Sequence, residues 1–266
     1  MADDLGDRMK LYESAEAGRN LMPLLPIMAR LDGRGFSGFT SGLAKPYDAR
    51  LSNLMIDCLK YLVKETNANC GYTQSDEITL TWYSPDFIKQ TFFNGRVSKL
   101  TSILAAMQSV YFNSKLNCIP ERVDCMPLFD CRVWNVPTLE EGANVFLWRE
   151  QDAIKNSISM AARAYFSHNE LLNKNGPHMK SMLLEKGVNW DDYPAFFKRG
   201  TYVQRQKVYR PFTPEEIDKL PPKHAARTSE VTVERTEYVA LDMPPFGSIL
   251  NRAEVIYSGA EPRYKD

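Results

Sequence analysis

The chain lacks the features that mark membrane proteins and proteins with a strongly basic surface. Its 33 basic and 33 acidic residues cancel, so a nucleic-acid partner would have to be held by local basic patches rather than by net charge. The longest apolar run, near residues 21–31, is broken by Pro23 and Pro26, so it is not expected to span a membrane. The amino terminus shows neither the basic nor the apolar segment of a secretory signal. These absences predict a cytoplasmic protein without a membrane partner.

Cysteine and histidine are also sparse, and their spacing does not suit a metal site. The five cysteines form no CxxC pair, and none of the three histidines stands at ligand spacing from them. An odd number of cysteines without a paired framework predicts reduced thiols in the core. The same spacing argues against zinc.

Two acidic sites stand out, each at the end of an apolar, strand-like run. The run at residues 24–31 breaks at Asp32-Gly33, which is a strong turn signal. A second turn, Ser75-Asp76-Glu77, separates two alternating runs at residues 70–73 and 78–83, which read as a hairpin with an acidic tip. Taken singly, either site is most simply a solvated turn.

The remaining elements place these two turns in one architecture. Apolar residues recur with helical spacing over 48–66 and again over 95–116, and residues 129–133 alternate as a fourth strand. The order strand, helix, strand, strand, helix, strand predicts an α+β, ferredoxin-like βαββαβ core with the first and third strands adjacent at its centre. Asp32 and Asp76 would then converge, as carboxylates do in polymerase palms that bind two metal ions. We therefore predict a catalytic palm domain at 21–137.

A mainly helical region is expected to follow at 138–257. A helix predicted from Thr138 to about residue 167 places Trp148, Asp152 and Asn156 on one face, which could hold a nucleotide or RNA or form a polar seam between helices. Residues 197–210 contain five basic residues and no acid, which favours a phosphate ligand or, alternatively, a solvated edge strand. A last alternating strand is predicted over 230–241.

Four short motifs occur in order along the chain. They are Arg-Leu-Asp-Gly-Arg-Gly-Phe at 30–36, Ala-Lys-Pro-Tyr-Asp at 44–48, Tyr-Thr-Gln-Ser-Asp-Glu at 72–77 and Phe-Lys-Arg-Gly-Thr at 197–201. Together they resemble the histidine-tRNA guanylyltransferase family, the 3′-to-5′ polymerases. The resemblance implies addition of nucleotides to the 5′ end of tRNA, with two Mg²⁺ ions as cofactors, GTP and ATP as substrates, and a homo-tetramer.

The resemblance also implies roles for individual residues. Asp32, the carbonyl of Gly33, and Asp76 would ligate Mg²⁺, and Glu77 would support catalysis. The nucleotide site would be lined by Asp32, Gly33, Arg34, Gly35, Phe36, Ser37, Ser75 and Asp76. The positions expected near the activated 5′ end or the triphosphates are Lys45, Asp48, Lys198 and Arg199.

One position departs from the family pattern. Eukaryotic members carry a His-Ile-Asn-Asn motif after a Trp-Arg-x-x-Asp stretch, whereas Ile154 stands here in place of the histidine. Isoleucine can neither donate nor accept a hydrogen bond. The chain therefore looks more like the bacterial and archaeal branch, whose members repair truncated tRNA 5′ ends by templated addition.

Two other functions fit parts of the pattern. A palm-type nucleotidyl cyclase would use the same metal chemistry, although the chain has no Gly-Gly-Asp/Glu-Glu-Phe turn. A non-catalytic RNA-binding module would explain the basic stretch but not the two acidic turns. Untemplated guanosine addition to histidine tRNA is a third alternative.

Overall fold

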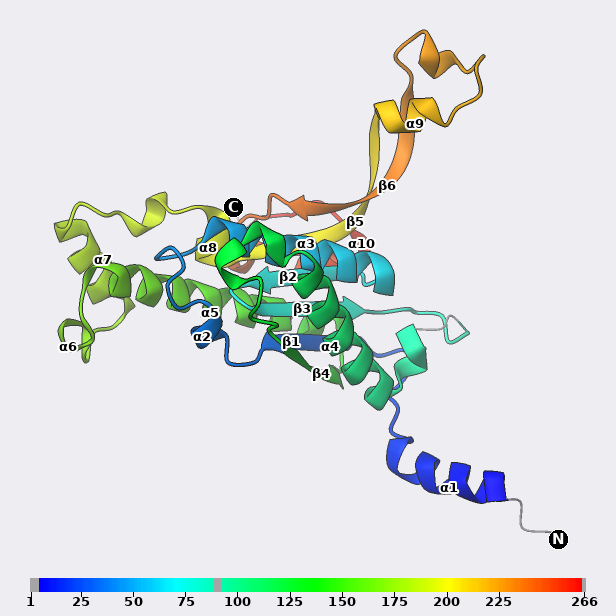
Figure 1. Cartoon of the computed structure of the whole chain (residues 1–266), viewed down its shortest axis with the longest axis horizontal. Helices are drawn as coiled ribbons and strands as arrows, with labels where there is room; N and C mark the ends of the chain where they lie inside the picture. The colour runs from blue at the N-terminus through cyan, green and yellow to red at the C-terminus, as the bar shows by residue number, and fades with distance from the viewer. Residues whose placement is uncertain (1–4, 89–91, 265–266) are drawn as a thin grey trace.

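A single antiparallel sheet forms the centre of the molecule (Figure 1). The computed structural model describes residues 5–88 and 92–264, so the first four residues, used above for the expected location, lie outside it. The six strands follow the order β4-β1-β3-β2-β5-β6. Their bounds are β1 Ile27–Gly33, β2 Cys70–Gln74, β3 Glu77–Trp82, β4 Phe129–Asn135, β5 Thr201–Pro211 and β6 Thr232–Leu241.

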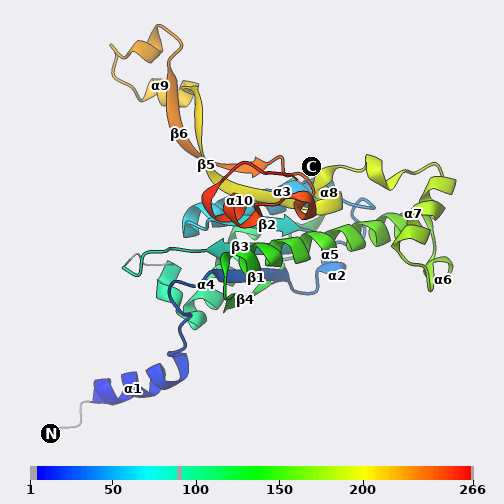
Figure 2. The ribbon, with the colours of Figure 1, turned by 180° about the vertical axis from the view of Figure 1, so that it is seen from behind.

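Two long helices, α3 (Ala49–Thr66) and α4 (Val97–Ser114), cover one face of the sheet, while α5 (Leu139–Tyr165) and α10 (Arg252–Ser258) cover the other (Figures 1 and 2). The alternation of β1 explains this layering. Ala29 and Leu31 point into the core under α3 and α4, and Met28 points into the second core under α5. Successive residues of β1 therefore contact opposite helical layers, because successive side chains of a strand point to opposite faces of the sheet.

Helix α3 has clear signals at both ends. The Asp48 side chain accepts a hydrogen bond from the Arg50 backbone N–H, which caps the amino terminus. Asn67 ends the helix in the left-handed conformation with φ 52°, and its N–H bonds to the carbonyls of Lys64 and Val63. Buried apolar side chains between these caps face the sheet.

The far half of α5 builds a third, smaller core. There Ile158 and Ala161 pack with Leu183 of α7 (Gly176–Glu185) and with Trp190. The short helices α6 (His168–Leu171) and α8 (Ala195–Arg199) flank this cluster. It lies beyond the sheet, at the end where β1 finishes (Figure 1).

Several segments project from this body. Strands β5 and β6 run on past the sheet as a hairpin arm that carries α9 (Pro214–Asp218) near its tip (Figure 1). Helix α1 (Leu5–Ala17) extends from the opposite side, and α2 (Phe36–Phe39) follows β1 directly. No helix of the described part of the chain has the length and apolar character needed to cross a membrane.

The predicted α+β core is confirmed, including the adjacency of the first and third strands. Three details differ from the sequence-based predictions. The strand predicted over 230–241 is confirmed as β6, but β5 and β6 join the palm's sheet through β2 instead of belonging to a separate, mainly helical region. Lys198 and Arg199 lie on α8 rather than on a strand. Cys118 and Cys125 are exposed, so only part of the cysteine set is in the core.

Candidate functional site

The two acidic turns meet at one end of the sheet. β1 pairs with β3 in the register Leu31↔Ile78, which places the last residues of β1 beside the tight turn between β2 and β3. A Cβ atom built on Gly33 would lie 2.9 Å from Oδ2 of Asp76, so the carboxylate rests against the backbone of β1. Glycine at this position permits that approach.

The described residues provide no basic partner for the charges of Asp32 and Asp76. Burial raises the pKa of Asp76, and the negative charge of Asp32 raises it further, while the Ser75 hydroxyl donates a 3.0 Å hydrogen bond that lowers it. Among the described residues, neither Asp32 nor Asp76 forms an ion pair with a basic side chain. Two neighbouring carboxylates without a cation suit a divalent metal ion.

The chain supplies only part of a metal coordination sphere. No group of three or more His, Cys, Asp or Glu side chains suited to a metal ion occurs within residues 5–88 and 92–264. Mg²⁺ in nucleotide enzymes is commonly held by one or two carboxylates together with substrate phosphates and water. Asp32, Asp76 and the Gly33 carbonyl fit such a site, and the missing ligands match what a triphosphate provides.

Glu77 turns away from this pair, into the interface with α5. Its carboxylate accepts two hydrogen bonds from Arg149, at 2.6 and 2.8 Å, and lies 3.8 Å from the guanidinium of Arg30. Arg149 also donates to Asp152 at 2.9 Å, and its guanidinium lies 4.5 Å from the centre of the Trp148 ring. This buried network ties β3 to α5, so Glu77 is a positioning residue in this structure.

A cavity of about 470 Å³ opens beside the carboxylates, between the segment before α3, the middle of α5, and α8. Four of the predicted site residues line it: Ser37, Lys45, Asp48 and Ser75. The lining residues that sequence reasoning did not select include Thr40, Tyr47, Gln74, Ser157, Arg163, Phe196 and Phe197. Tyr47, Gln74 and Phe197 stand in three of the short motifs, which is the signal that could have found them. The others lie outside the motifs and reach the cavity only through the fold.

Asp48 has a structural role in the wall of this cavity. Its two carboxylate oxygens accept hydrogen bonds from Arg50 at 3.0 and 2.7 Å, and Arg50 lowers the pKa of Asp48 to about 2. Asp48 therefore fixes the start of α3 and the loop that carries Lys45. Arg34 and Gly35 are exposed, and Phe36 is buried against Phe112 and Phe129.

Lys198 and Arg199 do not line the cavity. The ammonium group of Lys198 bonds to the carbonyl of Asp191 and lies 5.5 Å from the centre of the Trp190 ring. Arg199 donates to the carbonyl of Met243 at 3.1 Å. The cations of the cavity are instead Lys45 and Arg163.

The rest of the basic stretch is largely paired with acids. Lys207 lies 2.9 Å from Glu234, and Arg210 bonds to Glu216 and Glu237 at 2.8 and 2.5 Å. The phosphate interpretation is therefore wrong for these two residues, because carboxylates of α9 and β6 already neutralise them. On α5, Asp152 belongs to the polar network with Arg149. Asn156 donates a 3.2 Å hydrogen bond to Asp152 and also lines the cavity. The face predicted as either a ligand site or a polar seam therefore contributes to both a cavity and a polar network.

The Glu77–Arg149 pair predicts a large effect on stability. Glu77→Gln should lower the free energy of unfolding by about 3 kcal/mol, because it leaves a buried guanidinium without its main partner. Urea denaturation measures this loss. Glu121→Gln removes an exposed partner of Arg50 and serves as the control, with a much smaller expected change because solvent screens this pair. Equal effects of the two substitutions would contradict the structural role of Glu77.

Comparisons with known proteins show the family and the fold of this chain. Residues 6–137 match the family model described as tRNAHis guanylyltransferase (Thg1). A bacterial tRNA(His) guanylyltransferase (Thg1)-like protein in complex with ATP is 32% identical and superposes with a TM-score of 0.78, covering 96% of this chain and 99% of the other. A bacterial Thg1-like protein in complex with GTP is 31% identical, with a TM-score of 0.72 and coverage of 92% and 94%.

A curated relative gives the same assignment. The tRNA(His) guanylyltransferase of Debaryomyces hansenii is 27% identical over 222 residues, which span 76% of this chain and 82% of the relative. The likeness to this relative and to the bacterial structures extends well beyond the 6–137 match, into α5 and the strands that follow it. The chain belongs to the tRNAHis guanylyltransferase (Thg1) family and is a guanylyltransferase-like nucleotidyltransferase.

Proposed function

We propose that this enzyme adds nucleotides to the 5′ end of tRNA in the 3′-to-5′ direction, and that it repairs truncated 5′ ends by templated addition. The observation that carries the proposal is the pair of uncompensated carboxylates, Asp32 and Asp76, beside a cavity lined by Lys45 and Arg163. Such a site can bring a triphosphate and an RNA end together, an encounter that charge repulsion otherwise opposes.

Asp32, Asp76 and the carbonyl of Gly33 are the groups that would hold two Mg²⁺ ions. When bound there, the ions supply activation of a hydroxyl and neutralisation of phosphate charge. The burial that raises the pKa of Asp76 disfavours its free anion, so binding of a cation removes an unfavourable charge from this end of the sheet.

The cavity residues would bind and orient the nucleotides. Lys45 and Arg163 can contact phosphate oxygens, while Ser37, Ser75 and Asn156 offer neutral hydrogen-bonding groups. The ring of Tyr47 lies 4.8 Å from that of Phe197, which gives the wall an aromatic surface suited to a base. GTP and ATP are the proposed substrates, in keeping with the ligands named for the bacterial structures.

The reaction joins the 3′-oxygen of an incoming nucleotide to the 5′-phosphorus of the tRNA. The new phosphodiester bond forms as the bond to pyrophosphate breaks, and the proton of the 3′-hydroxyl passes to solvent. A tRNA with a 5′-monophosphate would first react with ATP, so that its 5′-phosphate carries AMP, with release of pyrophosphate. AMP is then the leaving group. The residues around the cavity hold the two reacting ends in line.

Packing around Ile154 supports templated addition. Its side chain packs against the apolar cluster of Ile158 and Trp190, so this position contributes to a core and offers no polar group to an RNA. Selection would then come from pairing of the incoming base with the opposite strand of the acceptor stem. Untemplated guanosine addition to histidine tRNA is the alternative, and a nucleotidyl cyclase is the more distant one.

The expected assembly and location follow from the same family likeness. We propose that the enzyme works as a homo-tetramer on tRNA in the cytoplasm. Size measurement in solution and imaging of the tagged chain in its host test these two statements separately.

Removing either carboxylate should abolish the chemistry without unfolding the protein. Asp32→Asn and Asp76→Asn should each lower nucleotide addition at least about a thousandfold, because the lost charge weakens cation binding rather than core packing. The assay follows the length of a tRNA that lacks its first nucleotide, with Mg²⁺ and all four nucleotides. Asp57→Asn, an exposed position on α3, is the matched control and should leave the rate unchanged. Near-normal turnover of either site variant would refute the assignment.

Templating is tested with four truncated tRNAs that present C, G, A or U opposite the vacant position. Each should receive the complementary nucleotide, whatever its anticodon, because no polar group at position 154 reads a particular tRNA. Product identity is resolved by nucleotide analysis of the extended strand. Guanosine addition regardless of the opposing base, or activity confined to a histidine anticodon, would favour the untemplated reaction instead.

A further inference from the structure

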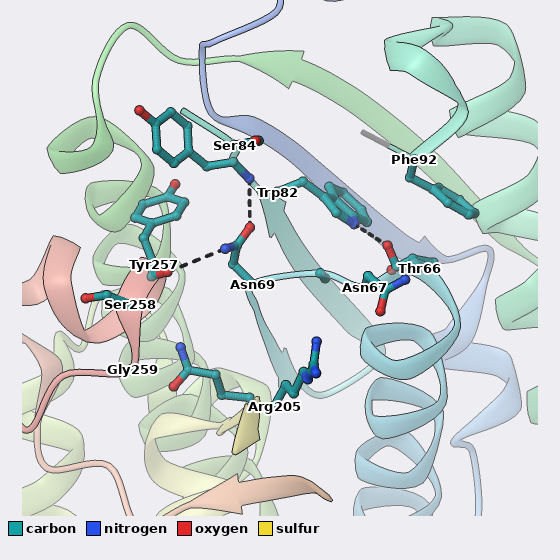
Figure 3. A pocket seen from close by; sticks show the side chains of 13 residues that line it. Thr66, Asn67, Asn69, Trp82, Ser84, Phe92, Arg205, Tyr257, Ser258 and Gly259 are labelled. Carbon is teal, nitrogen blue, oxygen red and sulfur yellow. Dashed lines mark hydrogen bonds between the residues drawn. The ribbon is translucent and has the colours of Figure 1, made fainter. Parts of the chain in front are cut away.

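A second cavity lies at the opposite end of the sheet from the carboxylates. It has a volume of about 580 Å³ and is bounded by the ends of α3 and α10, the start of β2, the end of β3 and the middle of β5 (Figure 3). β3 runs from Glu77 to Trp82, so about 17 Å of strand separates the two sites. We call this space the distal pocket, and the proposed activity does not use it.

Aromatic side chains form much of its wall. The parallel rings of Trp82 and Phe92 lie 6.4 Å apart between centroids (Figure 3). Tyr83 packs edge-on against Tyr257 at 5.9 Å. Trp82 is held in place by a 3.0 Å hydrogen bond from its indole N–H to the carbonyl of Thr66. Fixed aromatic surfaces of this kind bind flat, apolar rings.

One acceptor in the wall is oriented and has no partner. Gln204 is 5% exposed, and its amide nitrogen donates to the carbonyls of Val255 and Ile256 at 3.0 and 2.9 Å. These two bonds fix the direction of the amide, so its oxygen is the atom left toward the pocket. No donor reaches that oxygen within the described residues. An acceptor that is fixed in direction and has no protein donor can accept a hydrogen bond from an N–H group of a ligand.

The charge of the distal pocket favours an anion. Within the described residues, its lining contains no Asp or Glu and one cation, Arg205, which extends from β5 toward Asn67 (Figure 3). Arg205 has no hydrogen bond or ion pair with the described residues, unlike Lys207 and Arg210 further along the same strand. The Asn67 side-chain amide is likewise exposed and has no hydrogen-bond partner in the described structure.

The position of Arg205 near the end of α3 has a second explanation that needs no ligand, because the carbonyls at the carboxyl end of a helix attract cations. Several of those carbonyls are already satisfied, however. Thr66 accepts from Trp82, and the carbonyls of Val63 and Lys64 accept from the backbone of Asn67 and Ala68. A guanidinium beside satisfied carbonyls retains its donors for another partner.

We infer that the distal pocket binds a nucleotide, with its base against the aromatic wall, an N–H of the base on Gln204, and its phosphate on Arg205. The volume suits a single nucleotide. The ligand is either a free mononucleotide or an unpaired nucleotide of a bound RNA, since both present the same base and phosphate. The inference does not depend on the reaction at the carboxylate end.

Two substitutions separate the phosphate contact from the rest of the pocket. Arg205→Gln should weaken binding of AMP about tenfold, because it removes a charge-assisted contact, and should change binding of adenosine less than about twofold. Asn67→Gly suits the left-handed conformation at φ 52°, so it removes the amide without strain and should weaken both ligands. Lys207→Gln, two residues along β5, is the matched control and should have no effect.

Binding is measured by equilibrium dialysis of the full-length protein with AMP or adenosine in EDTA, which suppresses the metal-dependent site. Photocrosslinking with 8-azido-AMP, followed by peptide mapping, locates the ligand and should label the segments of Tyr83 or Tyr257. A short unstructured oligoribonucleotide distinguishes the sources. If the oligoribonucleotide binds at least about tenfold tighter than AMP, the ligand is a nucleotide of a bound RNA. If its affinity falls short of that tenfold gain, the ligand is a free mononucleotide.

Three results would overturn the inference. They are an absence of labelling in the wall of the distal pocket, equal losses of AMP and adenosine binding in Arg205→Gln, and a loss in Lys207→Gln as large as that in Arg205→Gln. Melting temperatures of the variants confirm that any loss is not caused by unfolding.

Discussion

The candidate site depends on the close approach of two negative charges, those of Asp32 and Asp76, at one end of the sheet. Asp32 and Asp76 are brought together by backbone pairing of β1 with β3, and the absence of a side chain at Gly33 allows the contact. Neither carboxylate has a basic partner among the described residues, so the sheet itself holds an arrangement that electrostatics opposes. A site of this kind gains stability when a cation arrives, which couples its geometry to its ligand.

Glu77, the residue after Asp76, supports the position of the two carboxylates. Asp76 and Glu77 are adjacent, yet Asp76 belongs to the turn between β2 and β3, while Glu77 begins β3 and points toward α5. The bond between Glu77 and Arg149 joins the sheet to the helix that also carries Asn156 and Arg163. One buried ion pair therefore aligns the acidic turn with the wall of the cavity. The basic residues near this end of the sheet therefore have two roles. Arg149 is structural, and Lys45 and Arg163 line the cavity in which phosphates would lie.

Much of the core could be predicted from sequence because its signals are local. The alternation of β1 and β3, the Asp48 cap, and the periodic apolar stripe of α3 each depend on residues within a few positions of one another. The strand order predicted from these elements, with the first and third strands adjacent, then placed Asp32 next to Asp76. The misassigned helix α8 had a local signal as well, because Gly200, with φ 75°, follows Lys198 and Arg199 as a helix stop.

The partners of the basic residues could not be predicted in this way. Lys207 and Arg210 find their carboxylates across a hairpin or on the following helix, and Lys198 turns to Trp190 in a separate core. Arg163 reaches the cavity from α5, more than a hundred positions from Lys45. Such pairings depend on tertiary contacts that no short pattern encodes. The composition shows how many basic and acidic residues the chain has. Only the fold shows which basic residues have no acidic partner and can bind a ligand.

The most direct test of the central claim is the number of divalent ions that the carboxylates hold. Equilibrium dialysis with Mn²⁺ and GTP, corrected for the Mn²⁺–GTP complex in the protein-free chamber, counts the ions bound to each chain. We expect about two ions for the wild type and at most about one for Asp76→Asn. Two ions of unchanged affinity in Asp76→Asn would show that the paired carboxylates are not the metal site.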